Sequence, residues 1–216
     1  MDWKGKTVAF LGDSITEGAA ASEPQNVYHQ VAARKLGFTA LNCGVSGTRI
    51  ARQLHPSADP SYDRDFNLRA DELPLNADFL VVLGGTNDFG HGDAPFGAPE
   101  DHTVYTFYGA CNSLWEKLAA RFGTGNILVV LPLHRTDEES PLGEGNKTCL
   151  GRTLSAYAAA IGQTARAHGL RVLDLRGEGA LDVRGEGAPL FADNVHPNDA
   201  GHRLLGEMIA EAMRRF

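Results

Sequence analysis

The sequence has few cysteines, and this argues against a protein stabilised by disulfides. Only Cys43, Cys111 and Cys149 occur in 216 residues, and their odd number leaves at least one thiol without an intramolecular partner. Their spacing fits neither a metal knuckle nor a redox pair. A reducing compartment, the cytoplasm, is the simpler prediction.

An excess of basic charge and a long apolar run are also absent. The chain has 20 lysines and arginines against 27 acidic residues, a formal net charge of -7, whereas a nucleic-acid-binding protein normally shows a basic patch. The first apolar run, Thr7–Leu11, is too short for a signal peptide core or a membrane span. We therefore expect neither nucleic acid nor a membrane as a partner.

Short aliphatic runs alternate along the chain with stretches of helical periodicity. The lengths of the runs suit buried parallel strands, which are apolar on both faces. The runs are Thr7–Leu11, Thr39–Cys43, Phe79–Leu83, Ile127–Leu131 and Arg171–Leu175. Stripes of apolar residues at spacings of three and four predict helices that pack on the core. These helices cover Val27–Leu36, Val104–Phe122, residues 154–165 and residues 204–213.

Strands that alternate with helices predict one α/β domain over residues 1–216, with a parallel five-stranded sheet between two layers of helices. By analogy with doubly wound folds, the expected strand order is 2-1-3-4-5. The switch point then lies between the first and third strands, and ligands bind beyond the carboxyl ends of the strands there.

Three of these strands are followed by small and polar residues, at the edge where a parallel sheet opens to solvent. The segments are Gly12-Asp13-Ser14-Ile15, Asn42-Cys43-Gly44-Val45-Ser46-Gly47 and Gly84-Gly85-Thr86-Asn87-Asp88. Nucleotide-binding doubly wound domains also carry glycine-rich segments here, so one such segment alone has little specificity.

A fourth polar segment, Asp193-Asn194-Val195-His196-Pro197, leads into the last predicted helix. A carboxylate three residues before a histidine can accept a hydrogen bond from its Nδ1, which leaves Nε2 free as a base. Pro197 suits the first turn of a helix or the approach to it. We predict that Asp193 orients His196 as the base for a nucleophile.

Ester hydrolysis requires a nucleophile, a base, an orienting acid and donors for the oxyanion. Ser14 is the candidate nucleophile and His196 its base. The backbone N–H groups of Ser14 and Gly44 and the side-chain amide of Asn87 are the candidate oxyanion-hole donors, because Gly44 lets a substrate approach closely and Asn87 offers two uncharged N–H donors.

The four segments together, in this order, resemble those of the SGNH hydrolases, the GDSL-type esterases and lipases. Gly12-Asp13-Ser14-Ile15 resembles the first conserved block, with Ile15 where many members have leucine. Gly44, Gly85-Thr86-Asn87-Asp88 and Asp193-Asn194-Val195-His196 resemble the second, third and fifth blocks. The resemblance implies a flavodoxin-like three-layer α/β/α sandwich, a carboxylic ester hydrolase without metal or cofactor, and the roles given above.

Other polar residues have simpler expected roles. Asp13 should brace its loop through backbone hydrogen bonds, and Asp88 should be structural. Asp13, Phe89, His134 and Val195 are also candidate substrate contacts. His91 is expected in a solvated loop rather than at a metal site, because no cluster with ligand spacing accompanies it.

Two long segments that follow strands, residues 89–103 and 134–148, are candidates for lids or substrate-binding loops. Their polarity disfavours a long-chain lipase and favours a small ester with a short acyl group, such as acetate on a sugar. Two other enzyme functions remain open, acyl transfer to another alcohol and thioester cleavage by the same triad. A non-catalytic flavodoxin-type binding module is the alternative from another class. The oligomeric state is left open.

Overall fold

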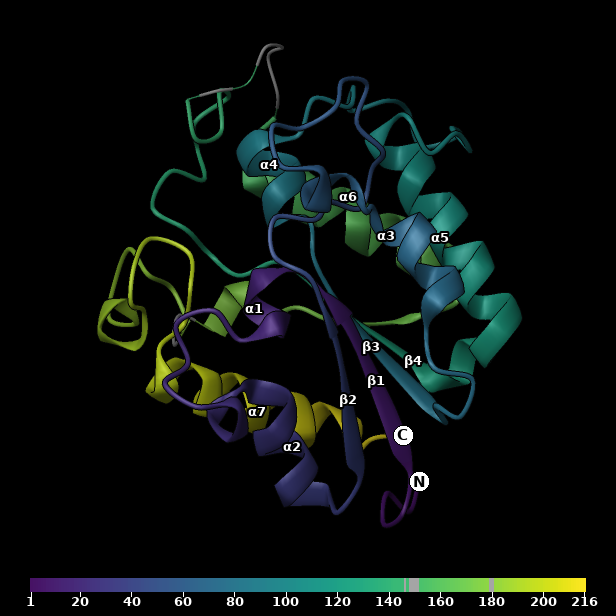
Figure 1. The fold of residues 1–216 in the computed structure, drawn as a ribbon, viewed down its shortest axis with the longest axis vertical. Coiled ribbons are helices and arrows are strands. Elements are labelled where there is room, and N and C mark those ends of the chain that lie inside the picture. The colour runs from purple at the N-terminus through teal and green to yellow at the C-terminus, as the bar shows by residue number, and fades with distance from the viewer. Residues whose placement is uncertain (146, 148–151, 179–180) are drawn as a thin grey trace.

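A twisted parallel sheet forms the centre of the molecule in the computed structural model, which describes residues 1–145, 147, 152–178 and 181–216. Its order is β2-β1-β3-β4-β5, and all four neighbouring pairs are parallel (Figure 1). The strands are β1 (Thr7–Gly12), β2 (Thr39–Gly44), β3 (Phe79–Leu83), β4 (Ile127–Val130) and β5 (Arg171–Leu173). The predicted three-layer fold and strand order are confirmed.

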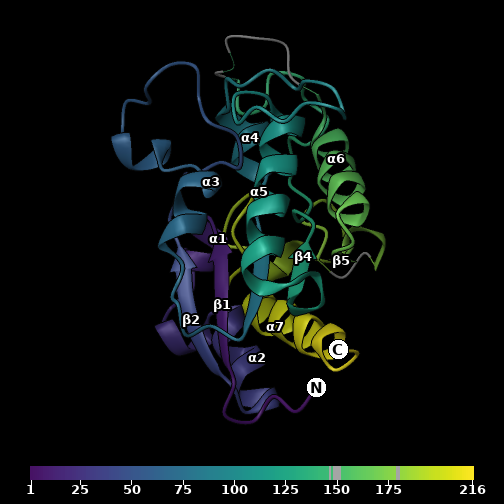
Figure 2. The same ribbon diagram turned by 90° about the vertical axis from the view of Figure 1, so that its right-hand side faces the viewer.

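Helices cover both faces of the sheet (Figures 1 and 2). On one face α2 (Tyr28–Leu36) packs against α7 (Asp199–Met213), and on the other α5 (Phe107–Phe122) packs against α6 (Leu154–Ala167). Three short helices follow strands or loops at the carboxyl edge and were not predicted. They are α1 (Ser14–Glu17), α3 (Phe66–Arg69) and α4 (Thr86–His91).

Alternate residues of the central strands enter two separate apolar clusters, one on each face. Ala9 and Leu11 of β1 pack with residues of α5 and α6, whereas Val8 and Phe10 pack with residues of α2 and α7. All four of these side chains are fully buried. Burial on both faces explains why the central strands read as continuous apolar runs rather than as alternating patterns.

Capping side chains mark the first residues of α5 and α7. Val104–Phe122 was predicted as one helix, but α5 starts three residues later, because Thr106 is extended and its hydroxyl accepts a hydrogen bond from the N–H of Gly109. Asn198 caps α7 in the same way by accepting from Ala200 and Gly201. Pro197 therefore lies just before the cap, on the approach to the helix.

The strand register places the polar segments side by side. Gly12, the last residue of β1, is opposite Gly44 of β2 and Leu83 of β3. The three segments that follow these strands therefore leave the sheet at neighbouring positions of the same edge. The helices α1 and α4 lie at this edge, and α7 begins near it.

Gly44 touches the backbone of α1, and a side chain there should destabilise the fold. A Cβ at Gly44 would lie 2.6 Å from the carbonyl carbon of Thr16 and would overlap the backbone of Glu17. We expect Gly44→Ala to lower the free energy of unfolding by about 1–3 kcal/mol, as overpacking does, in urea denaturation. Gly125→Ala is the control, because nothing lies within 4 Å of the added Cβ; equal stabilities of the two variants would contradict the expectation.

Candidate active site

Ser14 and His196 lie in hydrogen-bond contact although 182 residues separate them. Ser14 is the first residue of α1 and directly follows the turn at the end of β1. Its Oγ is 2.8 Å from Nε2 of His196. This distance allows a proton to pass from the hydroxyl to the imidazole.

Asp193 contacts the other ring nitrogen of the histidine. Its Oδ2 lies 2.8 Å from Nδ1 of His196, and its Oδ1 accepts the backbone N–H groups of Val195 and His196 at 2.8 and 2.7 Å. Although burial acts to raise the pKa of Asp193, the hydrogen bonds from His196 and Val195 lower it below its ordinary value. An ionised carboxylate requires the proton on Nδ1, so Nε2 is left to accept from Ser14.

The turn that carries Asp193 and His196 is closed by backbone hydrogen bonds. Phe191 and Pro197 form an antiparallel bridge, and the N–H of Ala192 donates to the carbonyl of His196 at 2.9 Å. At the start of α7, Asp199 accepts from the N–H and hydroxyl of Ser22 at 2.8 and 2.6 Å. These contacts hold the segment of the base against the segment that follows α1.

Asp13 braces the nucleophile's turn, as expected. It is the N-cap residue of α1, and its Oδ1 accepts the N–H of Ile15 at 3.1 Å. The residue is 1% exposed, and burial raises the pKa of its carboxyl to about 6. Oδ2 is buried and has no hydrogen-bond partner in the described part of the chain. A carboxyl buried in this way has no surface for a substrate, so its predicted second role as a substrate contact is not supported.

The loop after β2 contains two glycines with different contacts. The N–H of Gly44, predicted as an oxyanion donor, is occupied, because it donates to Oδ1 of Asn42 at 2.9 Å. Gly47 is buried with φ of 72°, and within the described ranges its N–H has no hydrogen-bond acceptor. Buried N–H groups are rarely left unpaired, and no protein group in the described ranges occupies that of Gly47. The pattern Gly44-Val45-Ser46-Gly47 contained this second candidate, which the sequence reasoning overlooked.

Two residues of α4 have distinct contacts. One N–H of the Asn87 amide donates to the carbonyl of Thr48 at 3.0 Å, and the residue is 7% exposed. The carboxylate of Asp88 accepts the backbone N–H groups of Ile50 and Ala51, each at 2.9 Å. Asp88 is therefore structural, as expected, and both residues tie α4 to the loop that follows Gly47.

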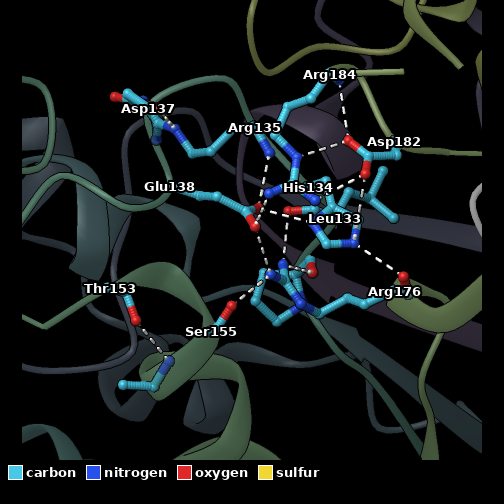
Figure 3. A network of polar contacts seen from close by, with 12 residues as sticks. Leu133, His134, Arg135, Asp137, Glu138, Thr153, Ser155, Arg176, Asp182 and Arg184 are labelled. Carbon is cyan, nitrogen blue, oxygen red and sulfur yellow. Dashed lines mark hydrogen bonds and ion pairs between the residues drawn. The ribbon is translucent and has the colours of Figure 1, made fainter. Parts of the chain in front are cut away.

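His134, predicted as a substrate contact, belongs instead to the polar network of Figure 3. Its Nδ1 lies 2.8 Å from Oε2 of Glu138, and its Nε2 lies 2.9 Å from the carbonyl of Arg176. The other carboxylate oxygen of Glu138 accepts from Arg176 at 3.1 Å and from Arg184 at 2.5 Å. With both ring nitrogens engaged, His134 links the segment after β4 to the segment after β5.

The other two predicted substrate contacts differ in exposure. Phe89 is fully buried beneath the guanidinium of Arg135, which lies 5.2 Å from the ring centroid, and so it cannot reach a substrate in this conformation. Val195 is half-buried beside His196. A buried aromatic side chain cannot be told from an exposed one by its place after a strand, which is why Phe89 was assigned wrongly.

The two predicted loops contact each other. Residues 89–103 begin inside α4, and the N–H of Glu144 donates to the carbonyl of Gly90 at 2.9 Å. Arg135 extends the contact, because its guanidinium bonds to Glu144 and approaches Thr86. Residues 146 and 148 of the second loop lie outside the described residues.

A cavity of about 810 Å³ lies beside α4. Most of the residues that line it have polar or charged side chains, among them Arg49, Ser57, Tyr62 and His91. His91 connects the cavity to Asn87, because its Nε2 lies 3.3 Å from Oδ1 of that residue. Asn87 is not among the residues that line the cavity, so His91 lies between the cavity and the amide of Asn87.

Neither a cluster of potential metal ligands nor a membrane-spanning helix occurs among the described residues. They contain no group of three or more histidines, cysteines or acidic residues placed to hold a metal ion. None of the helices described is both long and apolar enough to cross a membrane.

The chain is similar to known proteins in sequence and in fold. A family model described as the GDSL-like lipase/acylhydrolase family matches residues 10–204. A crystal structure of a protein from Lactobacillus plantarum is 30% identical, with a TM-score of 0.81 and 98% of both chains covered. A lipase/acylhydrolase from Enterococcus faecalis is 20% identical, with a TM-score of 0.64 and 97% and 96% of the two chains covered.

A third similar structure is a two-domain esterase active on acetylated mannans. It is 20% identical to this chain, with a TM-score of 0.63, and the match covers 99% of this chain and 50% of the esterase. At that identity the likeness shows the fold alone. None of the curated proteins matches the sequence.

The buried carboxyl of Asp13 should make stability depend on pH. Its pKa is raised from 3.8 to about 6 in the folded protein, so the folded state holds this proton more tightly than the unfolded state and loses stability as the pH rises through that interval. Asp13→Asn keeps a capping oxygen but cannot titrate. We expect the unfolding free energy of the variant, relative to the wild type, to rise by on the order of 2 kcal/mol between about pH 4 and pH 7 in urea denaturation. Parallel pH profiles would refute this role of burial.

Proposed function

The chain belongs to the GDSL-like lipase/acylhydrolase family and is a carboxylic ester hydrolase, and we propose that Ser14, His196 and Asp193 form its catalytic triad. The 2.8 Å contact between Ser14 Oγ and His196 Nε2 carries this proposal. The contact of Asp193 with Nδ1 supports it by fixing the tautomer that the base requires.

The proposed reaction passes through a covalent acyl-enzyme. Ser14 Oγ attacks the ester carbonyl while Nε2 of His196 takes its proton, and a tetrahedral oxyanion forms. As the C–O bond to the leaving alcohol breaks, His196 returns this proton to the alcohol. Water then attacks the acyl-enzyme with His196 again as base, which releases the acid and restores the Ser14 hydroxyl.

The proposed oxyanion donors are the N–H of Ser14, the side chain of Asn87 and a glycine N–H from the loop after β2. For the glycine we favour Gly47 over Gly44, because the Gly44 N–H donates to Asn42 whereas that of Gly47 has no acceptor within the described ranges. Glu17 supports this placement. Its carboxylate accepts from the N–H of Ser46 at 2.9 Å and so tethers the loop to α1.

The proposed substrate is an ester of a short acyl group, acetate in the first instance, with a polar alcohol such as a sugar. The polar and charged side chains that line much of the cavity near Asn87 support this class, since they can hydrogen-bond to a polar alcohol and a long acyl chain would need an apolar groove. An esterase whose structure includes a similar fold is active on acetylated mannans, which supports the proposed class. Acyl transfer to another alcohol and thioester cleavage by the same triad would appear in product analysis with competing alcohols and thioesters.

Ser14→Ala should remove activity, because no other group of the site can form the acyl-enzyme. We expect turnover of acetylated sugars and aryl acetates to fall at least about 10⁴-fold, and a fluorophosphonate probe to label the wild type but not the variant. Ser113→Ala is the matched control, since this serine on α5 bonds to the carbonyl of His102. Undiminished hydrolysis by Ser14→Ala would refute the triad, and an unlabelled wild type would favour a non-catalytic binding module.

Asn87→Ala should lower turnover more than substrate binding, because the oxyanion exists only during the reaction. Loss of one such donor typically reduces kcat by about 10²–10³. Steady-state kinetics on an aryl acetate should therefore show a reduced kcat with a nearly constant KM. A variant with the wild-type kcat would remove Asn87 from the proposed oxyanion hole.

A further inference from the structure

Asn87 and His91 lie one turn apart on α4, and their side chains touch. Nε2 of His91 is 3.3 Å from Oδ1 of Asn87. The expectation of a solvated loop histidine was therefore wrong for His91, which is helical and half-buried. Which of the two groups donates depends on where the imidazole carries its proton.

Arg49 determines that proton position. Its Nε and Nη2 lie 3.2 and 2.7 Å from Nδ1 of His91. A guanidinium can only donate, so Nδ1 must be the unprotonated acceptor and the proton of the neutral ring must be on Nε2. His91 Nε2–H is then the donor and Asn87 Oδ1 the acceptor.

Thr48 fixes the other end of the amide. Its carbonyl can only accept, so the amide nitrogen of Asn87 must face it, at 3.0 Å. A flip of the Asn87 side chain would break both contacts. It would place the amide NH2 against the Nε2–H of His91 and the amide oxygen against the carbonyl oxygen of Thr48. In the described residues the second N–H of Asn87 has no hydrogen-bond partner, which leaves it for a ligand.

The surroundings hold this arrangement rigidly. Arg49 is 4% exposed, and its Nη1 donates to Ser57 at 3.0 Å and lies 3.6 Å from Asp63. Burial and, after it, the charge of Arg49 lower the pKa of His91 to about 4. Both effects keep the ring neutral at the pH at which esterases are assayed.

We propose that His91, oriented by Arg49, is a positioning residue that holds the Asn87 amide with its free N–H available to the oxyanion. This rests on the proposed oxyanion role of Asn87. His91 does not touch the reacting atoms in this scheme. Its effect should therefore appear in kcat, through Asn87, and not in the affinity for the ester.

The tautomer can be observed directly. In a spectrum of the folded wild type with ¹⁵N-labelled histidine at neutral pH, we expect His91 as a neutral ring with its proton on Nε2, assigned by comparison with His91→Gln. A proton on Nδ1 would overturn the proposal, because Nε2 could then not donate to Asn87. This readout does not depend on activity, so it is separate from the test of the triad.

Kinetics test the consequence for catalysis. His91→Phe keeps a ring but removes both nitrogens, and we expect kcat on an aryl acetate to fall about tenfold, the effect of one lost hydrogen bond, with KM nearly unchanged. His91→Gln should restore most of kcat, because an amide both donates and accepts. His102→Phe, at an exposed site on another segment, is the control and should match the wild type.

A double-mutant cycle separates positioning through Asn87 from a general structural role. In the Asn87→Ala background, His91→Phe should have no further effect on kcat. An equal loss in both backgrounds, a rise in KM alone, or a wild-type kcat for His91→Phe or for Asn87→Ala would overturn the proposal. The proposed triad is tested separately, by the activity of Ser14→Ala. If His91→Phe fails to fold, His91→Gln in the same cycle and the tautomer measurement decide the matter.

Discussion

The hydrogen bond between Ser14 and His196 is the contact on which the site depends, and it joins the end of the first strand to the turn before the last helix. Neither residue could reach the other through local structure. Ser14 is placed by β1, a central strand of the sheet, and His196 by the turn that enters α7. α7 packs on α2, and both helices contribute to the apolar cluster of one face of the sheet, which connects the start of α7 to the strand that precedes Ser14.

Around this contact the protein buries an unusual number of polar groups. Asp13, Asn87 and Asp88 are each less than 8% exposed, and backbone groups of neighbouring segments bond to all three. Burial of polar groups is costly unless they are hydrogen-bonded. Only one carboxyl oxygen of Asp13 is hydrogen-bonded in the described residues. Its raised pKa reflects the free-energy cost of burying the carboxyl at the turn that carries Ser14. The apolar clusters on the two faces of the sheet must compensate for this cost.

The polar contacts at the edge of the sheet also connect segments far apart in sequence. The buried carboxylate of Glu138 contacts His134, Arg176 and the more exposed Arg184, so the segments after β4 and β5 are held together upstream of Asp193. Breaking a buried ion pair by removing one partner is costlier than the pair's net contribution suggests. This network joins two segments that precede the Asp193–His196 turn, and the sequence position of its histidine did not distinguish this structural role from a functional one.

Much of the fold and the core of the site can be inferred from local patterns. Continuous apolar runs indicate buried parallel strands, and the carboxyl ends of such strands meet at one edge, so Ser14 and Asn87 could be predicted to converge. The Asp193–His196 pair follows no strand, and the family resemblance placed it with them. The short helices α1, α3 and α4 could not be predicted, because each has too few residues for a periodicity to appear. The start of α5 at Phe107 likewise depends on one capping hydroxyl.

The assignments that differ all concern hydrogen bonds or burial between distant segments. The sequence shows two glycines after β2 but not that Asn42 occupies the N–H of Gly44. It shows His91 and His134 after strands but not that Arg49 and Glu138 engage them. By itself the sequence determined which groups can react, because side-chain chemistry and hydrophobic periodicity are properties of short stretches of sequence. Only the tertiary structure decided which N–H donors remain free, because an N–H group that donates to one acceptor is not available to another.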